Sequence, residues 1–497
     1  MCFMAERLDY SHPAARFAPA LAFLLALCAF LSLFHDIYVD DAYIALAYAR
    51  SFAASGTWGM HPGFVSNAAT SPLDVLLLSG FIKLGFPGVW AVYVFECVLA
   101  VVIFCALTFL SRRVFGSDLW AYLGTLALFT NPLLISTSGL ETYLFVAVLL
   151  GCVIAFLAAR YFLLGLAAGL LVLARPDGVL LLAPLFALMV WEKRGLDFVK
   201  VLVGFGIVVG AWGFVSWLYL GSAIPDTYFI KRKEAAWHDF SFANGLVLYY
   251  FKYPLATLLS LAPALFIPFA LPLAKTNRDW RAFVVLAGGL ALVHYAAYSL
   301  LNLPPYHWYY GIFISALALI GAGGLVVLTR EGHAARLAAL GLAAILALAG
   351  AVTCAEAALA RKQMPIHTNL GTVAQYRAIG EWLNANMPAH EYRIIGELGV
   401  IQYYGHADAV NSFSDRQILR DFAAKLPEHS PGKWLAELNF AHLTVRPPVG
   451  SDYRLEENCK DARGALKTWT TSSIWIDSVL WCLRRESPVS PASPRPD

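Results

Sequence analysis

Charged residues are scarce in this sequence: Asp, Glu, Lys and Arg make up 14% of the 497 residues, whereas hydrophobic residues make up 59%. The mean hydropathy of +0.63 excludes a soluble domain, and many apolar runs approach the roughly 20 residues that cross a bilayer. The net charge is only +3, and the basic residues are scattered through short loops, so we expect no nucleic-acid partner. The composition predicts a polytopic α-helical membrane protein.

Other features that are missing narrow the function. The sequence contains no Walker or Gly-rich phosphate loop, so no nucleotide-binding fold is expected. No A-x-A-like cleavage site precedes Asp40, which predicts that the first apolar segment is a retained helix. The apolar spans contain almost no ionisable residues, the exceptions being Glu96, His294 and Glu356. Because transporters usually carry charges near mid-span, this scarcity favours a protein that works at the membrane surface.

The basic residues of the short loops predict the topology. Arg7 and Arg16 precede the first span and place the N-terminus in the cytoplasm. The apolar run that begins at Ser71-Pro72 has about 13 residues, too few to cross, and treating it as juxtamembrane keeps Arg112-Arg113 inside. About eleven spans follow from this rule, with the C-terminus outside. They cover residues 14–34, 89–110, 119–135, 140–159, two short spans on either side of 175–178, and 199–220, 253–273, 282–301, 308–328 and 336–357.

Two further regions complete the predicted architecture. Residues 41–55 predict a helix that lies along the external membrane face and ends at Gly56. After Gln363 the chain becomes more polar, with an amphipathic helix over 372–386, a strand at 392–395 and a hairpin over 473–484. We therefore expect a transmembrane domain over 1–360, a small periplasmic α/β domain over 361–486, and a disordered tail, rich in Pro and Ser, over 487–497. Cys459 and Cys482 lie in the α/β domain and are candidates for a disulfide.

Polar residues gather at the predicted external ends of the spans. Asp40 and Asp41 stand at the mouth of the first span, where two adjacent carboxylates are costly unless water, a cation or a reacting group meets them. The others are Asn67, Ser71, Glu141, Arg175, Asp177, Lys231, Arg232, Lys233, His307, Tyr309 and Tyr310. Simple structural roles compete: an Asp that caps a helix, an Arg175–Asp177 ion pair that braces two short spans, and His307 in an aromatic belt. The joint placement of these residues on one face predicts a site there.

The Lys231-Arg232-Lys233 cluster breaks the positive-inside rule, because its loop is predicted to be external. A basic cluster that is retained against this rule indicates a binding function at that place, and a phosphate is a suitable ligand for it. A solvated loop and an anchor to lipid headgroups are the alternatives.

The motifs resemble those of the GT-C glycosyltransferases, membrane enzymes that use polyprenyl-phosphate sugars, and in particular their arabinofuranosyltransferase branch. The resemblance rests on Asp40-Asp41-Ala42-Tyr43-Ile44, Thr70-Ser71-Pro72-Leu73, Gly139-Leu140-Glu141-Thr142, Arg175-Pro176-Asp177-Gly178 and His307-Trp308-Tyr309-Tyr310. It implies that the transmembrane domain over 1–360 is a GT-C-like catalytic domain. It also implies an inverting transfer from a decaprenyl- or undecaprenyl-type phosphate donor, with a first-loop carboxylate as the catalytic residue. The run Ser66-Asn67-Ala68-Ala69-Thr70-Ser71-Pro72 replaces the Glu-Gly-Tyr-Thr-Ser-Pro pattern of the branch, which leaves acceptor recognition open.

The chemistry of such a transfer fits the available residue types. Asp41 or Asp40 would take the proton of the incoming hydroxyl as positive charge builds on the sugar ring. Cations would stabilise the departing lipid phosphate: Lys231, Arg232, Lys233, Arg175 and His307, or a divalent metal held by Asp40 and Glu141. Glu141, Asp177, Asn67, Ser71, Tyr309 and Tyr310 would complete the substrate pocket.

The sequence thus predicts a glycosyltransferase of the cytoplasmic membrane. Its active site faces the periplasm and moves a sugar, expected to be arabinofuranose, to a glycan or protein acceptor. A transporter or flippase of a lipid-linked sugar and a non-catalytic envelope assembly factor are the alternative functions.

Overall fold

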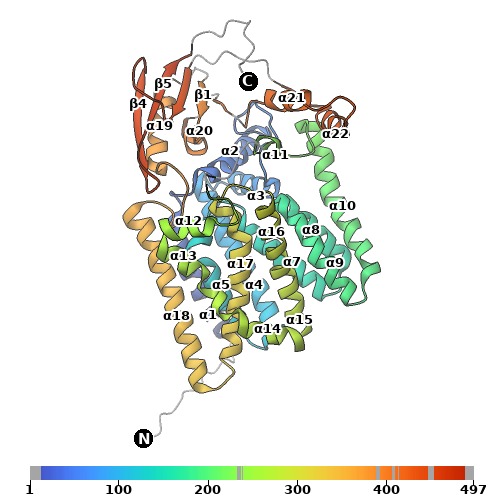
Figure 1. The fold of residues 1–497 in the computed structure, drawn as a ribbon. Coiled ribbons are helices and arrows are strands. Elements are labelled where there is room, and N and C mark those ends of the chain that lie inside the picture. The colour runs from blue at the N-terminus through green and yellow to red at the C-terminus, as the bar shows by residue number, and fades with distance from the viewer. Residues whose placement is uncertain are drawn as a thin grey trace.

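The computed structural model describes residues 13–231, 237, 239–387, 392–405, 409–411, 413–445 and 453–486. A bundle of long helices forms most of the molecule, and a small sheet with four helices sits on one end of it (Figure 1). The predicted fold class, a helical membrane protein with a C-terminal α/β domain, is confirmed.

The described part of the chain contains seven helical segments that are long and apolar enough to cross a membrane. They are α1 (Pro13–Leu31), α4 (Val89–Phe115), α10 (Phe198–Val215), α13 (Pro254–Leu261) with α14 (Ile267–Thr276), α15 (Arg278–Phe283) with α16 (Gly289–Leu300), α17 (Gly311–Leu328) and α18 (His333–Glu356). Four shorter apolar helices are α5 (Leu119–Phe129), α7 (Thr142–Leu157), α8 (Tyr161–Ala174) and α9 (Leu182–Trp191). Together they occupy the segments predicted as spans, and the chain is a multi-pass membrane protein.

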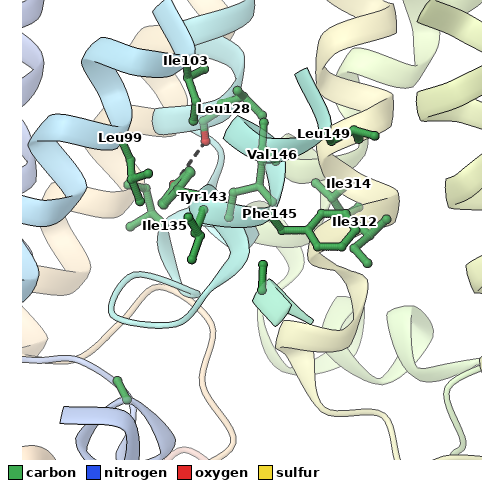
Figure 2. Close-up of a cluster of buried hydrophobic side chains, with 14 of the residues drawn as sticks. Leu99, Ile103, Leu128, Ile135, Tyr143, Phe145, Val146, Leu149, Ile312 and Ile314 are labelled. Atoms are coloured by element: carbon green, nitrogen blue, oxygen red, sulfur yellow. Dashed lines mark hydrogen bonds between the residues drawn. The ribbon is translucent and has the colours of Figure 1, made fainter. Parts of the chain in front are cut away.

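The interior of the bundle lies around α7, α4 and α17. Figure 2 shows the buried side chains that meet there, among them Leu99, Tyr143, Phe145 and Ile312. Small residues let α17 approach its neighbours closely, since a Cβ at Gly324 would lie 1.9 Å from the carbonyl oxygen of Phe266. Close packing of small residues is the usual means by which helices associate in lipid. The helices α1, α10 and α18 expose most of their surface and therefore face lipid.

Helices α2 (Asp40–Ser55) and α3 (Pro72–Lys83) form the first loop after α1. The predicted bounds of α2 are close to the observed ones, because Asp40 and Asp41 favour a helix start and Gly56, at φ +73°, ends it. The predicted position was only partly right. Tyr43 and Tyr48 are buried, and α2 packs against α20 (Gly399–Gly405) of the C-terminal domain instead of lying along an open membrane face.

The C-terminal domain is built on a five-stranded sheet with the order β2-β1-β3-β5-β4. Its strands are β1 (Tyr392–Ile395), β2 (Ala409–Val410), β3 (Tyr453–Glu457), β4 (Lys467–Ser473) and β5 (Ile476–Arg485). Strand β1 runs parallel to β2 and β3, whereas β5 is antiparallel to β3 and β4. The remaining helices are α19 (Val373–Asn386), α21 (Gln417–Ala424) and α22 (Pro431–Asn439). The predicted helix over 372–386 begins at a capping box made by Thr372 and Gln375.

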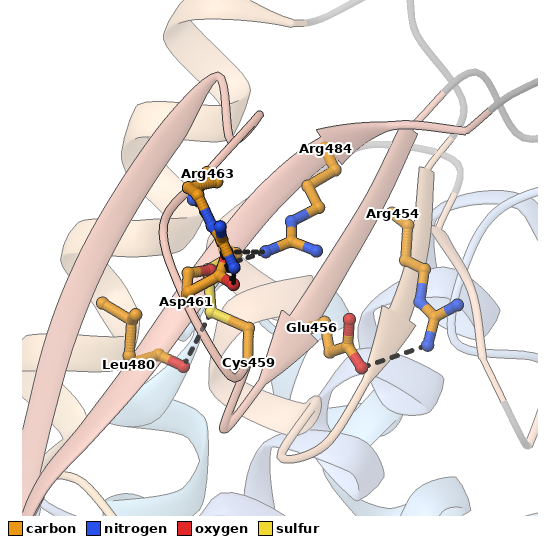
Figure 3. Close-up of a disulfide and its surroundings, with 8 residues drawn as sticks. Arg454, Glu456, Cys459, Asp461, Arg463, Leu480 and Arg484 are labelled. Carbon is orange, nitrogen blue, oxygen red and sulfur yellow. Dashed lines mark hydrogen bonds and ion pairs between the residues drawn. A yellow bond between two sulfur atoms is a disulfide. The ribbon is translucent and has the colours of Figure 1, made fainter.

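A disulfide joins Cys459, just after β3, to Cys482 in β5, the pair that the sequence suggested (Figure 3). The Cα atoms of the two residues are 6.1 Å apart, within the range of unstrained disulfides. Beside the bond, the Asp461 carboxylate contacts the guanidinium groups of Arg463 at 2.9 Å and Arg484 at 3.6 Å. The disulfide and this ion-pair cluster fasten the loop between β3 and β4 to β5.

Replacing Cys459 and Cys482 together with Ser should lower the stability of the C-terminal domain by about 3 kcal/mol, because the bond closes a loop of 23 residues. Thermal unfolding of the detergent-solubilised protein, followed through hydrogen exchange of β5, measures the effect. Cys105→Ser changes an exposed free cysteine and serves as the control. A double variant whose β5 is as protected as in the wild type would contradict the prediction.

Candidate active site

Asp40 joins the first loop of the bundle to the C-terminal domain. The residue is only 2% exposed, and its carboxylate accepts hydrogen bonds from the N–H groups of Leu398 at 3.2 Å, Gly399 at 2.7 Å and Val400 at 2.8 Å. These amides open α20, so Asp40 caps a helix of the other domain. Gly399 permits the approach, since a Cβ there would lie 2.1 Å from the Asp40 carbonyl oxygen. Both carboxylate oxygens of Asp40 therefore have a structural task.

Two further acids, Glu397 and Glu457, lie at this junction between the first loop and the C-terminal domain. The N–H of Glu397 donates to Oε2 of Glu457 at 3.1 Å. Burial raises the pKa of Asp40 to about 6, against the opposing effect of the α20 amides. Burial and the neighbouring Asp40 and Glu457 charges raise the pKa of Glu397 well above its usual range, and burial raises the pKa of Glu457 to about 7. The junction therefore retains protons at a pH where exposed carboxyl groups have lost them.

This cluster predicts that the junction is more stable in mild acid. The pKa values of Asp40, Glu397 and Glu457 are raised in the folded protein, so the folded state binds more protons than the unfolded state and stability falls as pH rises from about 4 to above 7. Thermal unfolding should show a higher melting temperature at pH 5 than at pH 8. Glu457→Gln should flatten this dependence, and an equally steep profile in that variant would contradict the assignment.

Asp41, the next residue, is half-buried and lies within electrostatic reach of the carboxyl groups of Glu141 and Glu397. Glu141 is brought to this place by Gly139, which has φ +83° and packs so closely on α2 that a Cβ would lie 2.9 Å from Ala42. The structure therefore brings together the predicted catalytic and secondary acids, Asp41 and Glu141.

Glu141 belongs to a buried charge network. Arg175 follows α8, and its guanidinium contacts Glu141 at 2.8 Å on one side and Asp177 at 3.0 Å on the other. Asp177 also accepts a hydrogen bond from the hydroxyl of Tyr298 at 2.8 Å and lies 3.0 Å from Nε2 of His294. The ion pair that was an alternative interpretation of Arg175 and Asp177 is present, and Glu141 extends it toward Asp41.

Asn67 and Ser71 hold the backbone around this network. The Asn67 amide donates to the Ser216 hydroxyl at 2.9 Å and to the Ser222 carbonyl at 2.8 Å. The Ser71 hydroxyl donates at 2.6 Å to the carbonyl of Ala174, the residue before Arg175. The first loop is thereby fastened to the ends of α8 and α10.

The aromatic motif at the start of α17 lies at the same end of the bundle. His307 is completely buried, with Nε2 3.0 Å from the Ser136 carbonyl oxygen. The Tyr310 hydroxyl donates at 2.6 Å to the Phe242 carbonyl. The ring of Tyr309 lies 5.2 Å from that of Tyr298, and the Tyr298 hydroxyl contacts Asp177. The aromatic motif therefore packs next to the charge network.

The basic cluster lies largely outside the described residues. Lys231 ends α11 (Asp226–Lys231), but its side chain, Arg232 and Lys233 are not described. The start of α11 is placed by Asp226, which accepts a hydrogen bond from the Asn67 N–H at 3.0 Å and forms a buried ion pair with Arg416 at 2.9 Å. This segment and the Asp40-Asp41 pair therefore lie at the same end of the bundle.

A cavity of about 510 Å³ lies between α11 and the C-terminal domain. Phe229 of α11 forms one side, and the segment that follows β1, including Gly396 and Leu398, forms another. The rest of the lining mixes apolar side chains, such as Ile418 and Leu426, with charged ones, among them Arg393 and Asp421. Because the Leu398 N–H is bonded to Asp40, the cavity wall adjoins the first-loop acids.

The two predicted metal ligands, Asp40 and Glu141, already have other partners. Both oxygens of Asp40 accept amide hydrogen bonds, and Glu141 is paired with Arg175. Within the part of the chain that the structure describes, no group of three or more His, Cys, Asp or Glu side chains is arranged to hold a metal ion. We therefore assign no step to a metal.

Several residues of this site were not predicted as such from the sequence: Glu397, Glu457, Asp226, Arg416, His294 and Tyr298. His294 and Tyr298 carried a usable signal. A histidine inside an apolar span, with a tyrosine four residues later, places two polar groups on the same helix face. The other four contribute through partners that are distant in the sequence.

Comparison with known proteins shows the fold. No protein-family model matches the chain, and no characterised protein matches it by sequence. The structure is similar to that of ArnT from Cupriavidus metallidurans, solved with undecaprenyl phosphate bound, with a TM-score of 0.61 and 13% identity over 95% of this chain and 98% of ArnT. The mycobacterial arabinofuranosyltransferase AftD gives a TM-score of 0.48 and 15% identity, over 94% of this chain and 40% of AftD. The predicted GT-C-like fold is confirmed.

Proposed function

We propose that the protein is a glycosyltransferase that takes a sugar from a polyprenyl-phosphate donor at the external face of the cytoplasmic membrane. The observation that carries this proposal is the half-buried Asp41 beside the Glu141–Arg175–Asp177 network, at the end of a bundle covered by a second domain. The fold adds support, since ArnT shares it along nearly its whole length and was solved with undecaprenyl phosphate bound.

Asp41 is the proposed base. As the oxygen of the acceptor hydroxyl forms its bond to the anomeric carbon, Asp41 takes the proton of that hydroxyl. The bond between the anomeric carbon and the donor phosphate breaks, its electron pair stays on the phosphate oxygen, and the lipid monophosphate leaves with inversion at the sugar. Asp40 is the weaker candidate because both its oxygens accept hydrogen bonds from α20 amides.

Arg175 and the basic cluster would meet the charge of the leaving phosphate. Arg175 is held between Glu141 and Asp177, so its guanidinium needs little rearrangement during the reaction. Since two carboxylates offset its charge, Lys231, Arg232 and Lys233 would supply the remaining positive charge. We assign His307 to holding the chain at this end, because its ring is buried against Ser136.

The acceptor would enter through the cavity next to Leu398. This cavity offers charged groups such as Arg393 and Asp421 for hydroxyl groups and the ring of Phe229 for a sugar face. The arabinofuranosyltransferase motifs favour arabinofuranose as the sugar, and the acceptor would be a glycan or a protein outside the cytoplasmic membrane.

A transfer assay with two donors tests this function. Membranes that contain the protein are incubated with radiolabelled polyprenyl-phospho-arabinofuranose or with its mannose counterpart. We expect arabinose label in covalent linkage to an external polymer or protein, and none in membranes without the protein. Label that crosses the membrane while still attached to lipid would indicate a transporter, and label that stays in the donor pool from both substrates would overturn the proposal.

A further inference from the structure

Helix α22 turns an apolar face outward. Trp434, Leu435 and Leu438 are 62%, 56% and 48% exposed. The inner face carries a polar residue instead: the Asn439 side chain accepts hydrogen bonds from the N–H groups of Ala223 at 3.0 Å and Ile224 at 3.1 Å. A surface helix of a water-soluble domain has the opposite arrangement, with its apolar stripe inward.

The position of α22 explains this reversal. The Trp217 indole, at the external end of α10, donates to the Leu438 carbonyl at 2.8 Å, and its ring lies 4.3 Å from that of His442. Figure 1 shows α22 beside this end of α10. Along the second half of α10 and the helical turn that follows it, the outward side chains are apolar, and Phe214 and Tyr219 are mostly exposed, as expected of a segment that faces lipid.

The exposed face of α22 therefore adjoins the exposed apolar surface of α10 at the end of this candidate membrane span. Trp and Tyr side chains are enriched at this level in membrane proteins, because their rings suit the boundary between lipid tails and headgroups. Trp434 on α22 and Tyr219 at the end of α10 both have this character.

Several bonds hold α22 at this depth. Its first turn is fastened to α21 by Lys433, whose ammonium donates to the Ala423 carbonyl at 3.1 Å. Helix α21 in turn follows Arg416, which is paired with Asp226 of α11. The helix is thus part of a rigid connection between the bundle and the C-terminal domain.

We propose that α22 is an interfacial membrane helix whose partner is the outer leaflet of the lipid bilayer. Trp434, Leu435 and Leu438 insert into the region between headgroups and acyl chains, with the axis of the helix along the membrane plane. The insertion holds α21 and its wall of the cavity at a fixed height above the membrane. This inference is independent of the proposed glycosyl transfer.

Tryptophan quenching tests the insertion directly. The full-length protein is placed in nanodiscs of phosphatidylcholine or of phosphatidylcholine brominated near the headgroup end of its chains. Subtracting the emission of Trp434→Phe from that of the wild type gives the emission of Trp434. The brominated lipid should quench this emission strongly. The emission of Trp469, a residue of β4 on the sheet, is obtained in the same way from Trp469→Phe and should not be quenched. An unquenched Trp434 component would overturn the proposal, and a dimer seen by mass with Trp434 shielded would assign the face to a second copy.

A second measurement examines the consequence for the domain. Replacing Trp434, Leu435 and Leu438 together with Ser should accelerate hydrogen exchange of α22 and α21 in nanodiscs. The matched control replaces Leu466, Ile474 and Ile476, exposed apolar residues around the β4–β5 hairpin, and should leave exchange in α22 unchanged. Equal exchange of α22 in the wild type and in the α22 variant would contradict membrane anchoring, whatever the transfer activity of either variant.

Discussion

Replacing Asp41 with Asn should abolish sugar transfer while leaving the protein folded and able to bind the lipid donor. An amide cannot take the proton of the acceptor hydroxyl, and loss of a positioned general base typically lowers the rate by about 10²–10⁴-fold. The size and shape of the side chain are retained, and Asp41 is only half-buried, so little change in stability is expected. Single-turnover transfer of radiolabelled sugar, together with binding of the donor, separates the two effects.

Asp36→Asn is the matched control for this experiment. Asp36 precedes α2 in the same segment, is exposed, and loses the same unit of charge in the variant. We expect near wild-type transfer from it. If Asp41→Asn transferred sugar as fast as Asp36→Asn, Asp41 would not be the base, and a scaffold function would gain support.

The spans were predictable because they depend on local composition. Long apolar runs and basic residues in short loops identify helices such as α4 and α18 without knowledge of any partner. The bounds of α2 and α19 were predictable for a similar reason. Gly56 ends the first, and the capping box at Thr372 begins the second, so each signal lies inside the segment that it controls.

The different roles of Asp40, which binds the amides of α20, and of Asp41, the proposed base, could not be predicted from the sequence. The two residues are neighbours of identical type, and the contacts that distinguish them come from Gly399 and Val400, more than 350 positions away. The same holds for Asp226, whose partner Arg416 lies 190 positions further on. Periodicity and motif spacing report what one segment prefers, whereas these pairs exist only after two domains have packed.

The predicted convergence of polar residues at one end of the spans is an intermediate case. Topology placed Glu141, Arg175 and Asp177 on one face of the membrane, because each follows or precedes a span that ends there. It could not show that Arg175 contacts both acids, which requires the close approach permitted at Gly139 and the packing of α8 against α7. The sequence therefore indicated the place of the site but not its internal bonds.

Replacing Asp40 with Ala should release the C-terminal domain from the bundle. The change leaves the N–H groups of Leu398, Gly399 and Val400 without their acceptor in a buried place. Each buried unpaired group costs about 1–3 kcal/mol, so the junction should lose several kcal/mol. Hydrogen exchange of α20 in the full-length protein, with limited proteolysis between α18 and α19, measures the release.

Comparing Asp40→Ala with Asp41→Asn distinguishes a structural role of Asp40 from a catalytic role of Asp41. Both variants are expected to lose transfer, because a released domain no longer encloses the site. Only Asp40→Ala should expose the amides of α20, whereas Asp41→Asn and the control Asp36→Ala should keep them protected. Asp40→Asn retains one acceptor oxygen and should fall between these results. Unchanged protection of α20 in Asp40→Ala would show that Asp40 does not hold the domain, and Asp40 would then return as a candidate for the base.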